Sequence, residues 1–208
     1  VSGTGKNGAS LFDVAGDLIV GSKGKGALAV TNGAKVESAN GYIANDIGSK
    51  GAVTVDGTGS KWKVANAIFS ELVVGVGGAG ALTISNGGTV ESEFNVIGED
   101  AGSQGIVTIV GAGSQWIAVG NPFSFIKVAD HGSGQLILSN GGVATSEGGN
   151  LGDDTTGNGK ATITGSGSAR CSPTITGIDT VSAPASTSSR ATWARACSAA
   201  RSAVSAAW

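Results

Sequence analysis

The chain has 208 residues, of which 37 are glycine, about one in six against roughly one in fourteen in ordinary proteins. Hydrophobic residues make up 40%, charged residues 13% and proline only 3 positions, which excludes collagen and argues against a disordered or proline-rich linker. The 13 Lys and Arg nearly balance the 15 Asp and Glu, and no apolar run approaches the length of a spanning helix. We therefore expect no nucleic-acid partner and no direct membrane insertion by this chain.

A sharp change in composition divides the chain into residues 1–168 and 169–208. All nine lysines lie at or before Lys160, and all four arginines lie after it, together with Cys171 and Cys197. The first part has a net charge of −5 and the second of +3. Two cysteines confined to the second part form no disulfide framework, so their redox state and the compartment are left open.

The first part matches itself as a 54-residue repeat, without insertion or deletion. The copies cover about residues 18–71, 72–125 and 126–168. Their most regular segment ends in Asn-Gly and reads Ala27–Gly33, Ala81–Gly87 and Gln135–Gly141.

Within each copy, short apolar runs alternate with small or polar residues. Leu82 and Ile84 flank Thr83, for example, which is the period of a β-strand. Asn-Gly and Gly-x-Gly turns follow one another too closely to leave room for helices. Equivalent side chains at a fixed spacing favour stacked coils, so we predict an all-β parallel β-helix, or β-solenoid, with about two coils per 54-residue unit.

Three kinds of residue have structural roles in this prediction. The glycine after each asparagine suits a turn with positive φ, and the asparagines can stack in a hydrogen-bonded ladder. The two tryptophans of the Gly-Ser-x-Trp turns either wedge into a corner of the coil or form a sugar-stacking stripe, and we favour packing. These residues are Asn32, Asn86, Asn140, Gly33, Gly87, Gly141, Trp62 and Trp116.

The segments Leu72–Gly75, Gly78–Val90 and Gly111–Trp116 carry a resemblance to a known family. Their register, with the Asn-Gly-Gly and Gly-Ser-x-Trp turns, resembles the repeat of autotransporter passenger domains of Gram-negative outer-membrane proteins. The resemblance covers about residues 1–168. It implies a right-handed parallel β-helix displayed on the cell surface, often as an adhesin or stalk. An export signal and a translocator barrel are not found in the sequence, which starts at Val1, so we expect a passenger fragment.

The tail, residues 169–208, breaks the repeat. Position 170, where the third copy should have Trp, is Arg170, and Gly and Lys disappear as Ala, Arg, Ser and Cys increase. We favour a reading-frame shift near residue 169 as the cause. The alternative is a genuine Ala/Arg/Ser-rich linker or helix.

Two features that resemble functional sites are better explained as structural. Gly75–Gly80 fits the dinucleotide fingerprint G-x-G-x-x-G, but another strand follows it, without a helix to hold a pyrophosphate. His131 is the single histidine, and its counterparts in the other copies are not histidines, so we interpret it as a solvated loop residue.

Acidic pairs recur at one corner of the expected coil. Stacked carboxylates can bind Ca²⁺, but a spacing of about 10 Å per 54-residue unit is too wide for one ion to bridge copies. We favour a solvated turn and predict no metal and no cofactor. The weak candidates for Ca²⁺ are Asp46, Glu99, Asp100, Asp153 and Asp154.

The sequence thus favours a structural or adhesive cell-surface segment without catalytic activity. Its expected partners are a host-cell or matrix surface or other cell-surface molecules. The alternative is a fragment of a carbohydrate-active β-helix enzyme that acts on a polysaccharide, with catalytic residues either outside the fragment or at the acidic corner. Loss of activity in Asp100→Asn would test the acidic corner. Unpaired strand edges at the ends of a solenoid also predict end-to-end self-association.

Overall fold

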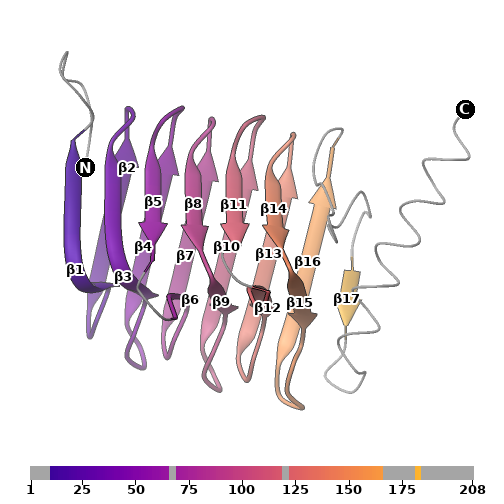
Figure 1. The fold of residues 1–208 in the computed structure, drawn as a ribbon. Helices are drawn as coiled ribbons and strands as arrows, with labels where there is room; N and C mark the ends of the chain where they lie inside the picture. The colour runs from indigo at the N-terminus through magenta and orange to yellow at the C-terminus, as the bar shows by residue number, and fades with distance from the viewer. Residues whose placement is uncertain (1–9, 66–68, 119–121, 166–180, 184–208) are drawn as a thin grey trace, which may run out of the picture.

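The computed structural model describes residues 10–65, 69–118, 122–165 and 181–183. Parallel strands stack into a β-solenoid of about six turns, which confirms the predicted fold class. Figure 1 shows the coils side by side in chain order from β1 to β16. Within the described ranges there is no helix, and so none long and apolar enough to cross a membrane. The interpretations of Arg170, Cys171 and Cys197 lie outside the described residues.

The strands are, in chain order, β1 (Leu11–Val20), β2 (Lys25–Thr31), β3 (Lys35–Ile43), β4 (Lys50–Asp56), β5 (Lys61–Val64), β6 (Glu71–Val74), β7 (Ala79–Ser85), β8 (Thr89–Ser92), β9 (Phe94–Ile97), β10 (Gln104–Val110), β11 (Gln115–Ala118), β12 (Phe125–Val128), β13 (Ser133–Ser139), β14 (Val143–Ser146), β15 (Gly148–Leu151), β16 (Asn158–Thr164) and β17 (Val181–Ala183).

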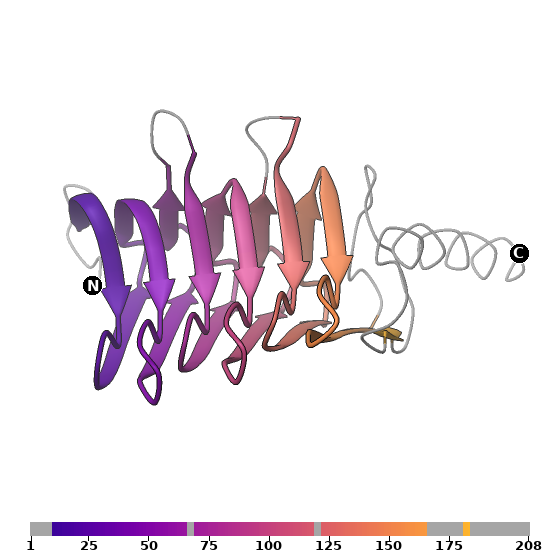
Figure 2. The same cartoon turned by 90° about the horizontal axis from the view of Figure 1, so that it is seen from below.

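These strands form two sheets that enclose the core. The seven-stranded sheet has the order β17-β16-β13-β10-β7-β4-β2, with only β17 antiparallel to its neighbour. The ten-stranded sheet has the order β14-β11-β8-β5-β3-β6-β9-β12-β15, with β1 beside β3. The long strand β3 pairs first with β5 and then with β6, so this sheet has two arms that later coils build from separate strands. Figure 2 shows the two sheets facing each other along the rod.

Coils of two lengths alternate. Lys50, Ala79 and Gln104 lie on one rung of the seven-stranded sheet, so a longer coil runs from Lys50 to Ala79 and a shorter coil from Ala79 to Gln104. Equivalent positions of successive copies therefore lie two coils apart. The longer coil connects the two arms by residues 65–70 or 119–124, where the shorter coil has a single residue, Glu93 or Glu147.

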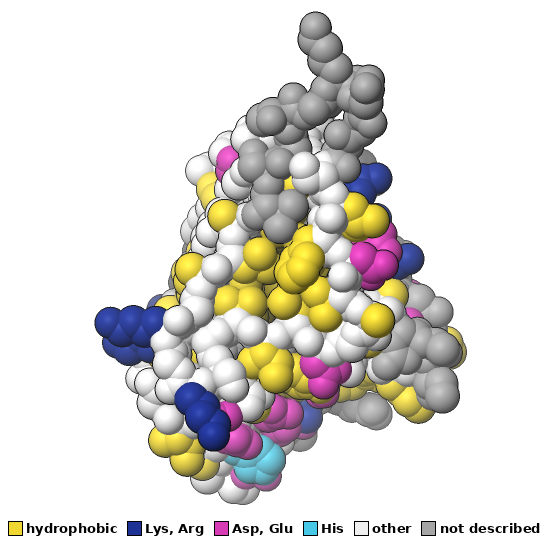
Figure 3. Space-filling view, turned by 90° about the vertical axis from the view of Figure 1, so that its left-hand side faces the viewer, with side chains coloured by type: hydrophobic (Ala, Val, Ile, Leu, Met, Phe, Trp, Pro, Cys, Tyr) yellow, Lys and Arg dark blue, Asp and Glu magenta, His cyan; other side chains and the backbone are white. Residues whose placement is uncertain are grey.

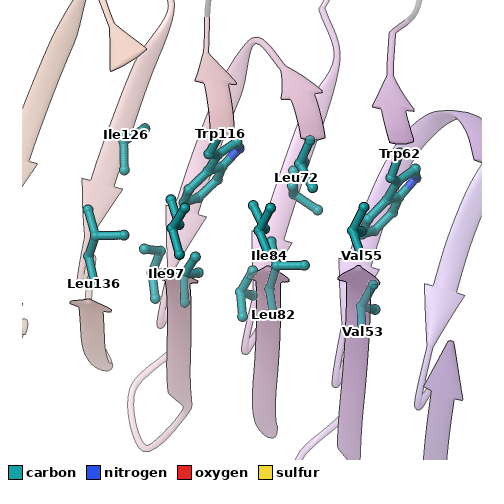
Figure 4. Packing of buried hydrophobic residues seen from close by; sticks show 14 of the residues in the cluster. Val53, Val55, Trp62, Leu72, Leu82, Ile84, Ile97, Trp116, Ile126 and Leu136 are labelled. Carbon is teal, nitrogen blue, oxygen red and sulfur yellow. The ribbon is translucent and has the colours of Figure 1, made fainter. Parts of the chain in front are cut away.

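Alternating side chains supply the core. In β7, Leu82 and Ile84 point inward and are 1% and 0% exposed, whereas Thr83 between them is half-buried. Figure 4 shows how such residues from successive coils pack into one continuous column. Each fully buried aliphatic side chain contributes roughly 1.5–3 kcal/mol relative to an exposed one. A single coil would leave most of this surface in water, so stacking stabilises the fold.

One inward position of the seven-stranded sheet is glycine in every coil because the neighbouring corner leaves no room for a side chain. A Cβ on Gly105 would lie 2.1 Å from the Val74 carbonyl oxygen and 2.5 Å from the Gly98 nitrogen. The register places six glycines on this rung: Gly26, Gly51, Gly80, Gly105, Gly134 and Gly159.

The Asn-Gly turns have the conformation that the sequence predicts. Asn86 and Gly87 have φ of 52° and 86°, and the equivalent pairs in the other copies are similar. The asparagines do not adjoin one another, because two copies are separated by an intervening coil with a different turn. Asn86 instead donates from Nδ2 to Asp56 Oδ1 at 2.7 Å, so the expected continuous ladder is interrupted.

Both tryptophans lie inside the coil at 0% exposure (Figure 4). Trp62 Nε1 donates to Ser38 Oγ at 3.1 Å, and Trp116 Nε1 donates to Ser92 Oγ at 2.9 Å. Ser92 in turn donates to Asn95 Oδ1, so this buried polar chain continues around the bend into the second arm. The rings therefore present no sugar-stacking stripe to solvent.

The N-terminal end of the described solenoid exposes apolar side chains. Leu11, Phe12 and Ile19 of β1 are 57%, 42% and 43% exposed. Figure 3 views this end of the rod and shows hydrophobic side chains gathered at its centre. End-to-end self-association stays a prediction.

Candidate functional site

The acidic corner is a stack of turns that lead from the second arm into the seven-stranded sheet. Backbone hydrogen bonds continue through it from coil to coil: Glu99 N donates to Gly75 O, and Asp153 N donates to Ala129 O, both within 3.0 Å. One column of the corner reads Asn45, Val76, Glu99, Asp130 and Asp153. The column beside it reads Asp46, Gly77, Asp100, His131 and Asp154.

This stacking brings only some of the predicted acidic residues together. Val76 and Gly77 separate Asp46 from Glu99 and Asp100, because the acidic turns of successive copies are two coils apart. Between Glu99 and Asp153 the intervening coil places Asp130, which the repeat pattern did not single out. The carboxylates thus concentrate at the C-terminal half of the corner.

Lys127 of β12 neutralises part of this cluster. Its Nζ lies 3.2 Å from Asp130 Oδ2 and 2.8 Å from Asp153 Oδ2, with the lysine side chain 18% exposed. Burial alone would lower the pKa of Lys127, but hydrogen bonds to Asp153 and Asp130 outweigh it and raise the pKa. Sequence analysis missed this residue, because its counterpart in the preceding copy is the apolar Val73.

Glu99 is the carboxyl group most perturbed by the corner. Burial raises its pKa to about 7, and the neighbouring carboxylates of Glu71, Asp100 and Asp130 add to the rise against the opposing charge of Lys127. The Glu99 side chain is therefore protonated in a large fraction of molecules at neutral pH. Nearby, the Tyr42 hydroxyl donates to Glu71 Oε2 at 3.4 Å, and burial with that carboxylate raises the Tyr42 pKa to about 12.

His131 lies between two carboxylates on neighbouring coils. Its Nδ1 is 3.6 Å from Asp130 Oδ1 and its Nε2 is 3.7 Å from Asp154 Oδ2, and half of the side chain is exposed. Asp154 accepts hydrogen bonds from the Thr155 hydroxyl and the Thr156 backbone, which lower its pKa. No Ser or Cys nucleophile faces this histidine among the contacts of the described residues.

The acidic corner does not gather enough ligands for a metal ion. Across the described ranges, no group of three or more His, Cys, Asp or Glu side chains could hold a metal ion. Lys127 occupies the space between Asp130 and Asp153 where a cation would bind. Calcium binding by Asp46, Glu99, Asp100, Asp153 or Asp154 therefore gains no support from the geometry.

A second surface feature, which the sequence analysis did not identify, lies on the outer face of the second arm. We call it the aromatic row: Phe69, Phe94 and Phe125. The ring centroids of Phe69 and Phe94 are 5.4 Å apart, and those of Phe94 and Phe125 are 5.3 Å apart. Lys127 Nζ lies 5.9 Å from the Phe125 ring centroid, at the end of the row.

Further apolar side chains border the aromatic row. Val73 and Val96, next to the row in β6 and β9, are buried although they are not part of the core cluster. Phe123 and Phe69, the equivalent residues of the two long connections, are 74% and 62% exposed. The signal that could have found the row is the recurrence of Phe-Ser at equivalent positions of two successive copies, at Phe69 and Phe123.

A third feature is an open cavity of about 420 Å³ on the first arm. Its lining includes the small side chains of Ala39 and Ala65, and Asp13, Glu37 and Lys63 lie on one rung of its wall. No ion pair joins these three within the described part of the chain. The cavity has no feature that selects a ligand.

Comparison with known proteins gives one informative similarity. The chain is similar to the uncharacterized lipoprotein YdeK of Escherichia coli strain K12, with 29% identity over 146 residues. That stretch is 69% of this chain but 11% of YdeK, so the chain spans a small part of its relative. No protein-family model and no solved structure matches the chain. The similarity to a lipoprotein is consistent with a place in the cell envelope.

Proposed function

We propose that the chain is a structural and adhesive segment of an autotransporter passenger domain, displayed on the bacterial surface and without catalytic activity of its own. The observation that carries this proposal is the unbroken, in-register stack of coils from β2 to β16. Such a stack gains length by adding coils and presents rigid outer faces for contact. The lipoprotein relative supports an envelope location, and the repeat resemblance supports the passenger assignment.

Antibodies raised against the purified chain test the location on cells of the source organism. We expect them to label intact cells as strongly as permeabilised cells. An antibody against a cytoplasmic protein, which should label only permeabilised cells, is the control. Labelling that requires permeabilisation would overturn surface display.

Adhesion is tested separately with beads that carry the chain. We expect such beads to bind host-cell or extracellular-matrix surfaces more than beads that carry an unrelated protein of similar charge. Equal binding of both bead types would leave display in place and remove the adhesive role.

One observation favours a second candidate function, a carbohydrate-active enzyme. A carboxyl group whose pKa is raised to about 7 by burial and by neighbouring carboxylates has the property expected of a general acid in glycoside hydrolysis. Glu99 would be the acid, with Asp100 or Asp130 as the partner. Release of reducing ends from a polysaccharide panel, abolished by Glu99→Gln and Asp100→Asn, would establish this function. If the unmodified chain releases no reducing ends from any polysaccharide of the panel, this candidate function is wrong.

A further inference from the structure

Within the described ranges, the phenylalanines and the tyrosine lie almost entirely on the second arm and the connections that lead into it. Of the 5 Phe and 1 Tyr in the chain, Phe12 alone lies elsewhere. The other five are Tyr42, Phe69, Phe94, Phe123 and Phe125, on β3, β9, β12 and the connections into β6 and β12. Exposed aromatic side chains that cluster on one face of a rigid scaffold are typical of a contact surface.

The two long connections at the edge of this face recur with a period of two coils. Phe69 and Phe123 are equivalent residues of the two long connections, which lead into β6 and β12. The register continues through both, since Phe94 N donates to Ser70 O and Gly148 N donates to Ser124 O, each at 3.0 Å. With coils about 4.8 Å apart, the two phenylalanines are separated by about 10 Å along the rod.

Acidic residues recur at the corner between the two arms with the same period, level with Ser70 and Ser124 of the long connections. Glu93 and Glu147 form the single-residue bends of the two shorter coils, so along the rod an aromatic connection alternates with an acidic bend. Glu71 adds a carboxylate beside the row, and Lys127, over the Phe125 ring, is held by Asp130 and Asp153. The face is therefore aromatic and negative.

A proline-rich segment in the polyproline II conformation matches this pattern. It has three residues per turn and advances about 9 Å per turn, close to the two-coil repeat. Proteins recognise such segments with aromatic side chains that contact the proline rings. If each triplet of the ligand contains one basic residue, that residue can pair with Glu93 or Glu147 while a proline of the same triplet contacts a phenylalanine of a long connection. The ligand and the protein then match in spacing and in charge.

We propose that the aromatic row, with Phe123, Glu93 and Glu147, binds a basic, proline-rich segment of a partner protein in the polyproline II conformation, laid along the axis of the rod. The proposal deepens the adhesive role and rests on it. A flat sugar platform fits less well, because neighbouring rings of the row are tilted by 50° and 63° instead of lying in one plane.

The test uses the full chain and a fluorescent peptide of repeated Pro-Pro-Lys triplets, with binding measured by anisotropy. We expect saturable binding that weakens as salt rises. The double variant Phe69→Ala/Phe123→Ala should weaken it about tenfold, as expected when aromatic anchors are lost. Glu93→Gln/Glu147→Gln should also weaken it and reduce its salt dependence. Phe12→Ala removes an exposed phenylalanine outside this face and is the matched control.

Two further peptides separate specific recognition from charge attraction. A peptide of the same composition in scrambled order breaks the triplet spacing, and a Pro-Pro-Glu peptide reverses the charge. If the scrambled peptide binds as tightly as the Pro-Pro-Lys peptide, the proposal is overturned. It is also overturned if the phenylalanine variant, folded by circular dichroism, binds the Pro-Pro-Lys peptide with unchanged affinity.

Other occupants of the face are distinguishable outcomes. Phenylalanine-dependent binding of neutral oligosaccharides in place of the peptide, or phenylalanine-dependent dimerisation in light scattering, would each overturn the proposal in favour of that ligand. Cell-surface labelling and bead adhesion do not use the peptide. If those two experiments succeed and the peptide does not bind, this inference is wrong and the proposed function stands.

Discussion

At the residue scale, the glycine rung of the seven-stranded sheet sets how closely neighbouring strands and corners approach. A Cβ at these positions would meet backbone atoms, which cannot move aside as the end of a flexible side chain can. The side-chain hydrogen bonds of the turns act at the same scale: Ser60 and Ser114 accept from Gly33 N and Gly87 N at 3.0 and 3.1 Å. The side chains that these positions tolerate are therefore determined by contacts with the next coil and not by their neighbours in the sequence.

Gly105→Ala should therefore destabilise the solenoid by about 1–3 kcal/mol, the usual cost of forcing extra atoms into a packed interior. Chemical denaturation followed by circular dichroism measures the loss. Gly24→Ala is the control, because a Cβ there would meet nothing within 4 Å and the backbone has no positive φ. Equal stability of the two variants would show that the corner relaxes freely around a methyl group.

Glu99→Gln should stabilise the fold at neutral and alkaline pH but not at acidic pH. The pKa of Glu99 is about 7 in the folded chain and 4.5 as its ordinary value, so the folded state binds the proton more tightly. The contribution of Glu99 to stability is complete below about pH 4.5 and is lost as pH rises through 7.

The neutral amide cannot lose a proton, so its advantage should grow across this window to about 1 kcal/mol, a figure reduced because the side chain is partly exposed. Thermal melting from pH 4 to 8 measures it. Glu147→Gln, at an exposed bend, is the control. A constant difference between Glu99→Gln and the unmodified chain at all pH values would contradict the prediction.

At the element scale, the alternation of large and small residues across coils decides where the tryptophans fit. The inward column of the first arm reads Val36, Trp62, Val90, Trp116 and Ala144, so each indole stacks against smaller neighbours. Each indole N–H needs a partner because it is fully buried, and a serine on the adjoining coil supplies it. The strands and the serines thus form one packing unit.

Ser92→Ala should cost about 1–3 kcal/mol, because it leaves the buried Trp116 indole N–H and the Asn95 side-chain oxygen Oδ1 without the serine hydroxyl. Urea unfolding monitored by tryptophan fluorescence measures the change. Ser146→Ala is the matched control, since the same position of the third copy is followed by Arg170 in place of a tryptophan. A cost for Ser146→Ala as large as that for Ser92→Ala would mean that the indole hydrogen bond is not the cause.

The sequence allowed the strands and turns to be predicted because their signals are local. Alternation of Leu82 and Ile84 about Thr83 specifies a strand, and Asn-Gly specifies a turn with positive φ, whichever coil lies beside it. The pKa of Glu99 depends first on burial by the stacked coils, then on the carboxylates of Glu71 and Asp100, and also on Asp130 and Lys127 of the next coil. A comparison of equivalent positions in successive copies does not reveal burial or contacts between neighbouring coils. The aromatic row was missed for the same reason, since Phe94 and Phe125 are neighbours only in the stack.

At the scale of the whole molecule, the alternation of longer and shorter coils makes a pair of coils the unit that can be removed without disturbing its neighbours. Deletion of residues 72–125 takes out two coils and joins Glu71 to Ile126, which keeps the strand pattern and leaves Trp62 next to Ala144. Deletion of residues 79–103 takes out one coil and joins Gly78 to Gln104. It brings Trp116 next to Trp62 and removes Ser92, the hydrogen-bond partner of Trp116.

The smaller deletion should therefore be the more damaging one. Overpacked indoles and an unpaired buried N–H each cost about 1–3 kcal/mol, whereas the two-coil deletion loses coil interfaces but creates no misfit. We expect the two-coil deletion to melt cooperatively at the higher temperature, with a rod about 10 Å shorter than the parent in small-angle scattering. A one-coil deletion that melts at the same or a higher temperature would show that single coils are interchangeable, and that the outer features recurring every second coil, Phe69 and Phe123 among them, are not tied to the packing of the core.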